Sequence, residues 1–326
     1  MTNRDDTDPT ADGAPSARLR LPRVSAGTAG LLSLFLAASV RVVPLFGALI
    51  APLGLIPVLH FQAGGTSGIR AWGWVTAVLI ASSVLPLGSF PLEVLGAYVL
   101  IVALPAATVE LWARWGWSEG RWALVAVASA LVVILGGLSL VMIDTGPVQG
   151  LTTWFHDQTA LAIEMYNSVG VSTGQMELAF DATERAAAIL VPGAMLAYFV
   201  VIVFWVRPRI PVLGYDVEVR PFEEYRNDDW LAAGFAVAGL GALFLTGLPR
   251  WLSLNLLIAV LLLYFVQGLA MIRAHLARWV GRGWFVRWGI ALMCIYPPMP
   301  VLVATLGVAD SFLPLRPRTS DDGGQT

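Results

Sequence analysis

The chain has 326 residues, of which 57% are hydrophobic and 13% are charged, and its mean hydropathy is +0.73. Soluble domains carry roughly 25% charged residues, so this composition excludes an ordinary soluble fold. The formal net charge of −2 gives no basic surface that would indicate nucleic-acid binding. The single cysteine, Cys294, lies in an apolar run, excludes an intramolecular disulfide and is interpreted as a small buried hydrophobe.

The first stretch, residues 1–24, is polar with little apolar content, and it is interpreted as a disordered cytoplasmic tail. The alternative is a cleaved signal peptide with a small-residue site at positions 37–39. Cleavable apolar cores span about 7–15 residues. Here the apolar character continues well past Ser39, so the sequence favours an uncleaved chain.

Residues 27–61 form the first apolar segment, which is interrupted by Arg41 and three prolines. With about 35 residues, it is long for one membrane crossing and short for two full ones. A guanidinium in hydrocarbon is costly unless it faces protein or water. The sequence therefore predicts two tilted or short helices that meet near Arg41–Gly47 and place the charge at an interface.

The later apolar segments are each about as long as the ~20 residues that a helix needs to cross a bilayer. They are residues 71–87, 91–112, 121–143, 186–206, 230–248, 251–272 and 284–308. The pair at 230–272 is the clearest, because it is almost uncharged and is broken only at Gly247-Leu248-Pro249-Arg250. These two segments predict a transmembrane hairpin, since in lipid a helix satisfies its own backbone hydrogen bonds.

The arginines fix the predicted orientation, because basic loops stay on the cytoplasmic side. The arginines expected there are Arg18, Arg20, Arg23, Arg70, Arg114, Arg121, Arg207, Arg209, Arg220, Arg226, Arg273, Arg278, Arg282 and Arg287. This placement requires residues 27–61 to cross twice. Nine crossings leave Arg316 and Arg318 outside, unless the prolines at 297–300 split the last segment. The prediction is an all-α, polytopic membrane helical bundle with eight or nine transmembrane helices.

Between the spans, residues 144–185 predict an external amphipathic helical segment that is nearly free of basic residues. Leu151, Trp154, Leu161 and Met165 recur at helical spacing, and Ser172 opens a second helix. We expect the first helix to lie on the outer membrane surface or over the bundle mouth. The domain organisation is then a transmembrane domain at 25–318, with a compact cytoplasmic loop at 207–229 and a disordered tail at 319–326.

Sequence motifs for catalysis or metal binding are absent. There is no P-loop, paired-cysteine motif, HExxH or GxSxG, and the three histidines lie in different segments. The sequence therefore predicts no enzyme activity, no cofactor and no metal site. The expected partners are the lipid bilayer and another membrane or regulatory protein.

Polar side chains inside the spans are the candidate ligand-binding residues, because an ionisable or polar group in hydrocarbon indicates function. They are Arg41, Asn255, Gln267 and Tyr264. Asn255 and Gln267 lie about a third of a turn apart around one helix and are expected to face the bundle interior. The alternative for these two is inter-helix hydrogen bonding. Glu110 is interpreted as the partner of Arg114, four residues later.

Four stretches of the second half carry a family likeness. Pro249-Arg250-Trp251, Asn255-Leu256-Leu257 and Leu263-Tyr264-Phe265-Val266-Gln267-Gly268-Leu269-Ala270 resemble the hallmark region of the YybS-like family of predicted bacterial membrane proteins. Val191-Pro192-Gly193, Pro221-Phe222 and Leu306-Gly307-Val308-Ala309-Asp310 are similar to further parts of that family. The ending departs from the family, because Leu313-Pro314-Leu315 replaces an aromatic and acidic pair before the arginine.

The family is a domain of unknown function and is distantly similar to the substrate-binding components of energy-coupling-factor transporters. The resemblance implies an outward-opening ligand pocket covered by the 144–185 segment, and a membrane coupling subunit as partner. We expect a multi-pass protein of the bacterial cytoplasmic membrane that binds or transports a small molecule without its own ATPase. The alternative is a membrane assembly or regulatory protein that acts through a protein partner and transports nothing.

Overall fold

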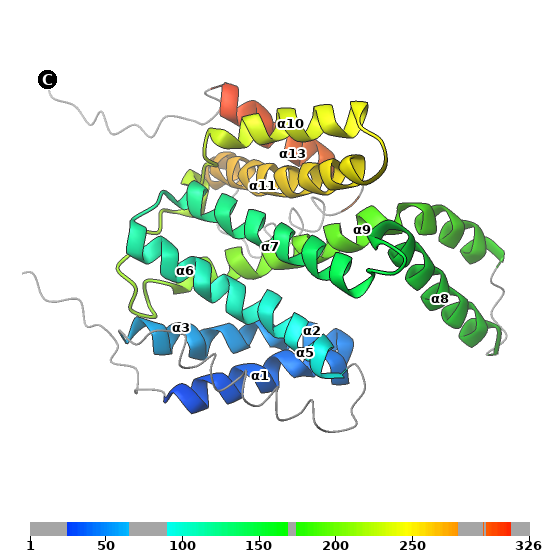
Figure 1. Ribbon diagram of the computed structural model, residues 1–326. Coiled ribbons are helices and arrows are strands. Elements are labelled where there is room, and N and C mark those ends of the chain that lie inside the picture. Colours follow the sequence, from blue (N-terminus) through cyan, green and yellow to red (C-terminus); the bar gives the residue numbers. More distant parts are fainter. Residues whose placement is uncertain (1–24, 65–89, 169–173, 280–295, 297, 314–326) are drawn as a thin grey trace, which may run out of the picture.

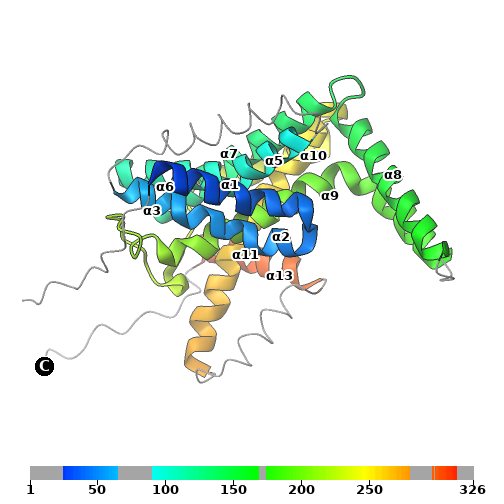
Figure 2. The same ribbon diagram turned by 90° about the horizontal axis from the view of Figure 1, so that it is seen from below.

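The computed structural model describes residues 25–64, 90–168, 174–279, 296 and 298–313 of the chain. The regular elements are α1 (Ala26–Val42), α2 (Pro44–Ile50), η1 (Ala51–Gly54), α3 (Leu55–Ala63), α5 (Phe90–Tyr98), η2 (Val99–Ala103), α6 (Leu104–Trp115), α7 (Glu119–Val141), α8 (Pro147–Ser168), α9 (Gly174–Val206), η3 (Arg207–Arg209), η4 (Phe222–Glu224), α10 (Trp230–Phe244), α11 (Gly247–Trp279) and α13 (Met299–Phe312). All of these elements are helices, which confirms the predicted all-α class. Most of them form one bundle, and α8 stands away from it at one end (Figures 1 and 2).

Five helical stretches in the described part are long and apolar enough to cross a membrane. They are Phe46–Ala63, Val94–Trp115, Glu119–Val141, Ala186–Arg209 and Gly247–Leu276. Three shorter apolar helices, α1, α10 and α13, have 17, 15 and 14 residues. At 1.5 Å per residue they span about 21–26 Å, which is less than a hydrocarbon core of about 30 Å. Five is fewer than the predicted eight or nine crossings, and the predicted segment at 71–87 and much of 284–308 lie outside the described residues. The tails at 1–24 and 319–326 also lie outside them.

The first apolar segment folds back on itself where its prolines and Arg41 predict a turn. α1 ends at Val42 and α2 begins at Pro44, and α1 then packs along α2, η1 and α3. Small residues allow this approach. A Cβ added to Gly47 would overlap the backbone of Ser39, and one on Gly54 would lie 3.0 Å from the carbonyl oxygen of Ser33.

The C-terminal helices pack in an equally close arrangement. α10 and α11 form a hairpin as predicted, but its break lies at residues 245–246 and the predicted break at 247–250 is the first turn of α11. α13 lies along α11 (Figure 1). A Cβ on Gly268 would overlap the carbonyl oxygen of Val303, and a Cβ on Gly307 would overlap that of Tyr264. Small residues at such crossings let helix backbones approach closely, which favours van der Waals packing between helices in lipid.

A proline inside α9 is compensated by a side chain of α11. Pro192 has no N–H and cannot bond the carbonyl of Ala188, four residues earlier. Trp251 of α11 instead donates its Nε1–H to that carbonyl oxygen at 2.7 Å, and both residues are buried. Asn255, one turn later, donates its Nδ2–H to the Trp251 carbonyl oxygen at 2.9 Å. Two stretches that carry the family likeness, around Pro192 and around Trp251, therefore meet in the fold.

The predicted external segment forms two helices, as its apolar spacing indicates. α8 packs against the first part of α9, and Nδ1 of His156 lies 3.0 Å from a carboxylate oxygen of Glu184. Trp154, Leu161 and Met165 remain exposed along one side of α8. The opposite end of the bundle carries the segment 207–229, where α9 ends and α10 begins (Figure 1). We call this end the loop face.

Candidate functional site

Segment 207–229 is fixed to the loop face by buried polar contacts, and Gln267 of α11 is the centre of the first set. Its side chain is fully buried. Its Oε1 accepts a hydrogen bond from the Asn227 backbone N–H at 3.1 Å. Its Nε2 donates to Oδ2 of Asp310 at 2.9 Å and lies 3.2 Å from Oγ of Ser311. The side-chain amide of Gln267 therefore links both segment 207–229 and α13 to α11.

Asn227 and Tyr225 extend this set. Asn227 donates its Nδ2–H to the Leu263 carbonyl oxygen at 3.0 Å and accepts the Tyr225 hydroxyl at 2.7 Å on its Oδ1. Tyr225 is buried, and its ring meets Phe204 edge-on with centroids 5.0 Å apart. Burial raises the pKa of the Tyr225 phenol, because the phenolate would lose its water.

The second set centres on Arg207, which is only 4% exposed at the end of α9. It forms an ion pair with Glu119 at the start of α7 and donates an Nη2–H to the Arg220 carbonyl oxygen at 2.6 Å. A second ion pair joins Arg121 of α7 to Asp228 of segment 207–229, with a nitrogen–oxygen distance of 3.3 Å. A buried charge is tolerated only when it is paired, so Glu119 and Arg207 hold α7 and α9 together at this end.

The third set joins the segment to α3 and α6. The Tyr215 hydroxyl donates to Oε1 of Gln62 at 3.1 Å, and Nε2 of Gln62 donates to Oε2 of Glu110 at 3.3 Å. Burial, and the negative charge of Glu110, raise the pKa of Tyr215. Glu110 also pairs with Arg114, which confirms the predicted i,i+4 pair.

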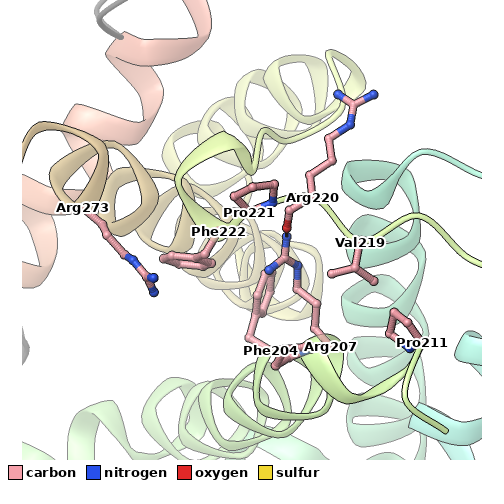
Figure 3. Close-up of a pocket in the computed structure, with 9 residues that line it drawn as sticks. Phe204, Arg207, Pro211, Val219, Arg220, Pro221, Phe222 and Arg273 are labelled. Carbon is pink, nitrogen blue, oxygen red and sulfur yellow. Dashed lines mark hydrogen bonds between the residues drawn. The ribbon is translucent and has the colours of Figure 1, made fainter. Parts of the chain in front are cut away.

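An open cleft of about 640 Å³ lies between the end of α9, segment 207–229 and α11 (Figure 3). Its lining residues are Phe204, Arg207, Pro208, Pro211, Val219, Arg220, Pro221, Phe222 and Arg273. The walls are therefore mostly aromatic and proline surfaces, with three arginines among them. We call it the arginine cleft.

The ring of Phe222 is central to the arginine cleft. The guanidinium carbons of Arg207 and Arg273 lie 5.9 Å and 5.8 Å from its centroid, within the range of cation–π attraction. Nε of Arg273 also lies 2.6 Å from a carboxylate oxygen of Glu223. Figure 3 shows that the Arg220 side chain points away from these groups, whereas its carbonyl faces Arg207.

The four predicted ligand-binding residues do not come together. Gln267 and Tyr264 lie one turn apart on α11, and both are buried beside α13. Asn255 is buried twelve residues earlier, which is about 18 Å along the helix. Arg41 is exposed near the end of α1, at the end of the bundle away from the loop face.

None of the four lines the arginine cleft, and their binding role stays a prediction. Gln267 and Asn255 instead make the hydrogen bonds that the alternative interpretation expects. Sequence reasoning missed Arg207, Phe222 and Asn227. The sequence features that could have indicated this site are the Pro221-Phe222 pair and the arginines of the same segment.

Long apolar helices and closely packed glycines between them define a multi-pass helical membrane protein. The chain belongs to a family of predicted membrane proteins, DUF2232, whose family model matches residues 30–311. This match establishes the membrane-protein family, while the YybS name and the likeness to substrate-binding components remain expectations. No curated protein and no solved structure gives a significant match to the chain.

Proposed function

We propose that this protein is a membrane component that binds a small molecule in the arginine cleft, without catalysis and without an ATPase of its own. The observation that carries the proposal is the cleft itself. Its volume of about 640 Å³ lies within the range of roughly 300–1,000 Å³ that small-molecule sites occupy. Its walls combine aromatic and proline surfaces with arginine side chains, and such sites are apolar surfaces with a few polar groups that orient a ligand.

The proposal includes eight or nine crossings of the bacterial cytoplasmic membrane, with the loop face inside. Arg114, Arg121, Arg207, Arg209, Arg220, Arg226 and Arg273 belong to the loop-face end of the described chain. The opposite end carries Arg41, Arg185 and Arg250. This asymmetry of arginine supports a cytoplasmic loop face.

A coupling subunit remains the proposed partner if the protein transports its ligand. The geometry changes one part of this expectation. The resemblance implies an outward pocket under the 144–185 segment, whereas the arginine cleft lies at the end of the bundle away from α8. We therefore propose ligand access from the cytoplasmic side.

Binding is tested on purified protein in detergent by thermal unfolding against a broad panel of metabolites. A ligand present at about 100 Kd should add ~2.7 kcal/mol of stability. Phe222→Ala should abolish the stabilisation, because Phe222 forms the central wall of the cleft. Leu243→Ala is the matched control, because Leu243 is exposed on α10 and lies outside the cleft. Stabilisation that persists in Phe222→Ala would refute this site.

A second candidate function, partner binding through segment 207–229, is favoured by the three buried anchor sets that preorganise this surface. A photo-crosslinking residue at Glu218, which is exposed on the segment, should then capture one dominant protein in cells. The same residue at Val132, which is exposed on α7, is the control. Equal capture patterns at both positions would argue against this function.

A further inference from the structure

We infer that the arginine cleft takes the phosphate group of an anionic amphiphile, such as a glycerophospholipid with a phosphodiester head. This inference rests on the proposed function and names its ligand class. Three features of the cleft support it: its charged lining residues, its hydrogen-bond donors and its depth relative to the spans.

The charged residues that line the arginine cleft favour an anionic ligand. Arg207 is paired with Glu119 and Arg273 is paired with Glu223. Among the ion pairs of the described residues, none includes Arg220. Among the residues that line the cleft, three are arginines and none is a carboxylate, so the lining itself favours an anionic group such as a phosphodiester.

The donors of the cleft fit phosphate oxygens. A guanidinium carries five N–H groups, and the contacts of Arg207 described above use its Nε and Nη2. Arg273 has an exposed side chain that uses its Nε toward Glu223. The Arg220 side chain is long and exposed, so rotation about its side-chain bonds can turn its guanidinium toward the cleft. Arginine forks of this kind bind phosphate through two parallel hydrogen bonds.

The position of the cleft fits a lipid head group. Phe204 and Arg207 lie in the last turns of the candidate span Ala186–Arg209, and Arg273 lies in the last turn of Gly247–Leu276. The cleft is therefore at the depth where the hydrocarbon core ends. Val201, three residues before Phe204, is 63% exposed and offers an apolar path for an acyl chain.

The test measures binding of a short-chain phosphatidylglycerol to the full chain in detergent, by thermal stabilisation and by native mass spectrometry. Its comparison ligands are a neutral diacylglycerol with the same chains, a zwitterionic phosphatidylcholine and glycerol phosphate. We expect the phosphatidylglycerol to bind tightest, and the neutral diacylglycerol to bind about tenfold or more weakly because it lacks the charge-assisted hydrogen bonds.

The variant Arg220→Gln/Arg273→Gln should lose about tenfold in affinity for phosphatidylglycerol. Arg114→Gln removes an exposed arginine elsewhere on the loop face and should change the affinity less than about twofold, since it makes no contact with the cleft. Equal binding of the diacylglycerol, or an equal loss in Arg114→Gln, would overturn the inference. Glycerol phosphate that binds as tightly as the lipid would overturn the amphiphile assignment in favour of a soluble phosphate.

The same experiment separates this inference from the proposed function. If a different metabolite binds wild type but not Phe222→Ala, while no phosphate compound binds, the phosphate assignment fails and the cleft remains a small-molecule site. If the phosphatidylglycerol binds wild type and Phe222→Ala equally, the cleft is refuted for both.

Discussion

Replacing Trp251 with phenylalanine tests how α9 tolerates its internal proline. The indole Nε1–H donates to the Ala188 carbonyl oxygen at 2.7 Å, and this oxygen has lost its helical donor to Pro192. Phenylalanine keeps most of the buried ring but leaves the carbonyl without that donor. An unsatisfied buried acceptor costs about 1–3 kcal/mol in soluble proteins. Inter-helix hydrogen bonds in membranes average about 0.6 kcal/mol. We therefore expect Trp251→Phe to lower the free energy of unfolding by about 1 kcal/mol.

A double-mutant cycle isolates this hydrogen bond from the change in ring size. Pro192→Ala restores a backbone N–H that can donate to the Ala188 carbonyl oxygen. When Pro192→Ala is already present, the same Trp251→Phe change should therefore cost much less than in the wild type. The coupling between the two positions should approach the value of the bond itself, about 1 kcal/mol, because only one acceptor is shared.

The measurement is reversible unfolding of the four proteins in detergent micelles or bicelles, for example by steric trapping. The control for a general loosening of α11 is a second cycle, in which Asn255→Ala takes the place of Pro192→Ala and is combined with Trp251→Phe. Equal costs of Trp251→Phe with and without Pro192→Ala would refute the explanation, because the indole would then not be replacing the missing backbone donor.

Three other consequences can be measured in the same way. Gly307→Ala should destabilise the bundle by about 2 kcal/mol or more, because its Cβ overlaps the α11 backbone, whereas Gly137→Ala in open surroundings should be neutral or stabilising. Gln267→Leu should lower the free energy of unfolding by about 2–3 kcal/mol, because it removes hydrogen bonds to two other parts of the chain. Asn255→Leu should lower it by about 1 kcal/mol or less, because it removes a hydrogen bond within α11. Stability should fall as the pH rises above about 10, because the unfolded tyrosine ionises there while burial raises the pKa of Tyr225. Tyr225→Phe should reduce this alkaline slope and leave the part that comes from Tyr215, and an unchanged slope would contradict the burial of the Tyr225 phenol.

The sequence was sufficient for features that depend on local composition. The uncharged runs of α10 and α11 predicted their hairpin, and the prolines around Arg41 predicted the turn between α1 and α2. The spacing of Glu110 and Arg114 predicted their ion pair. The ion pair depends on two residues four positions apart, and the two turns depend on the composition of the adjoining runs, so local sequence is enough to predict them.

The candidate site could not be predicted in the same way. Gln267 contacts Asn227 and Asp310, which lie 40 and 43 residues away in the chain, and Arg207 pairs with the still more distant Glu119. In a membrane bundle, apolar side chains face both lipid and protein, so the hydrophobic period does not show which face of a helix is buried. The angle between Asn255 and Gln267 predicted a shared side, but their separation along α11 prevents them from lining one cavity.

The polar anchors also bear on how segment 207–229 should be studied. Gln267, Gln62 and Glu119 lie at the loop face outside this segment, and each takes a partner from it. Deleting the segment would leave these groups without those partners, and a buried polar group without a hydrogen-bond partner is costly. The segment is thus part of the bundle's own stability. A loss of ligand or partner binding on its deletion would therefore report unfolding of the loop face. Single substitutions at exposed positions such as Arg220 and Glu218 separate function from folding.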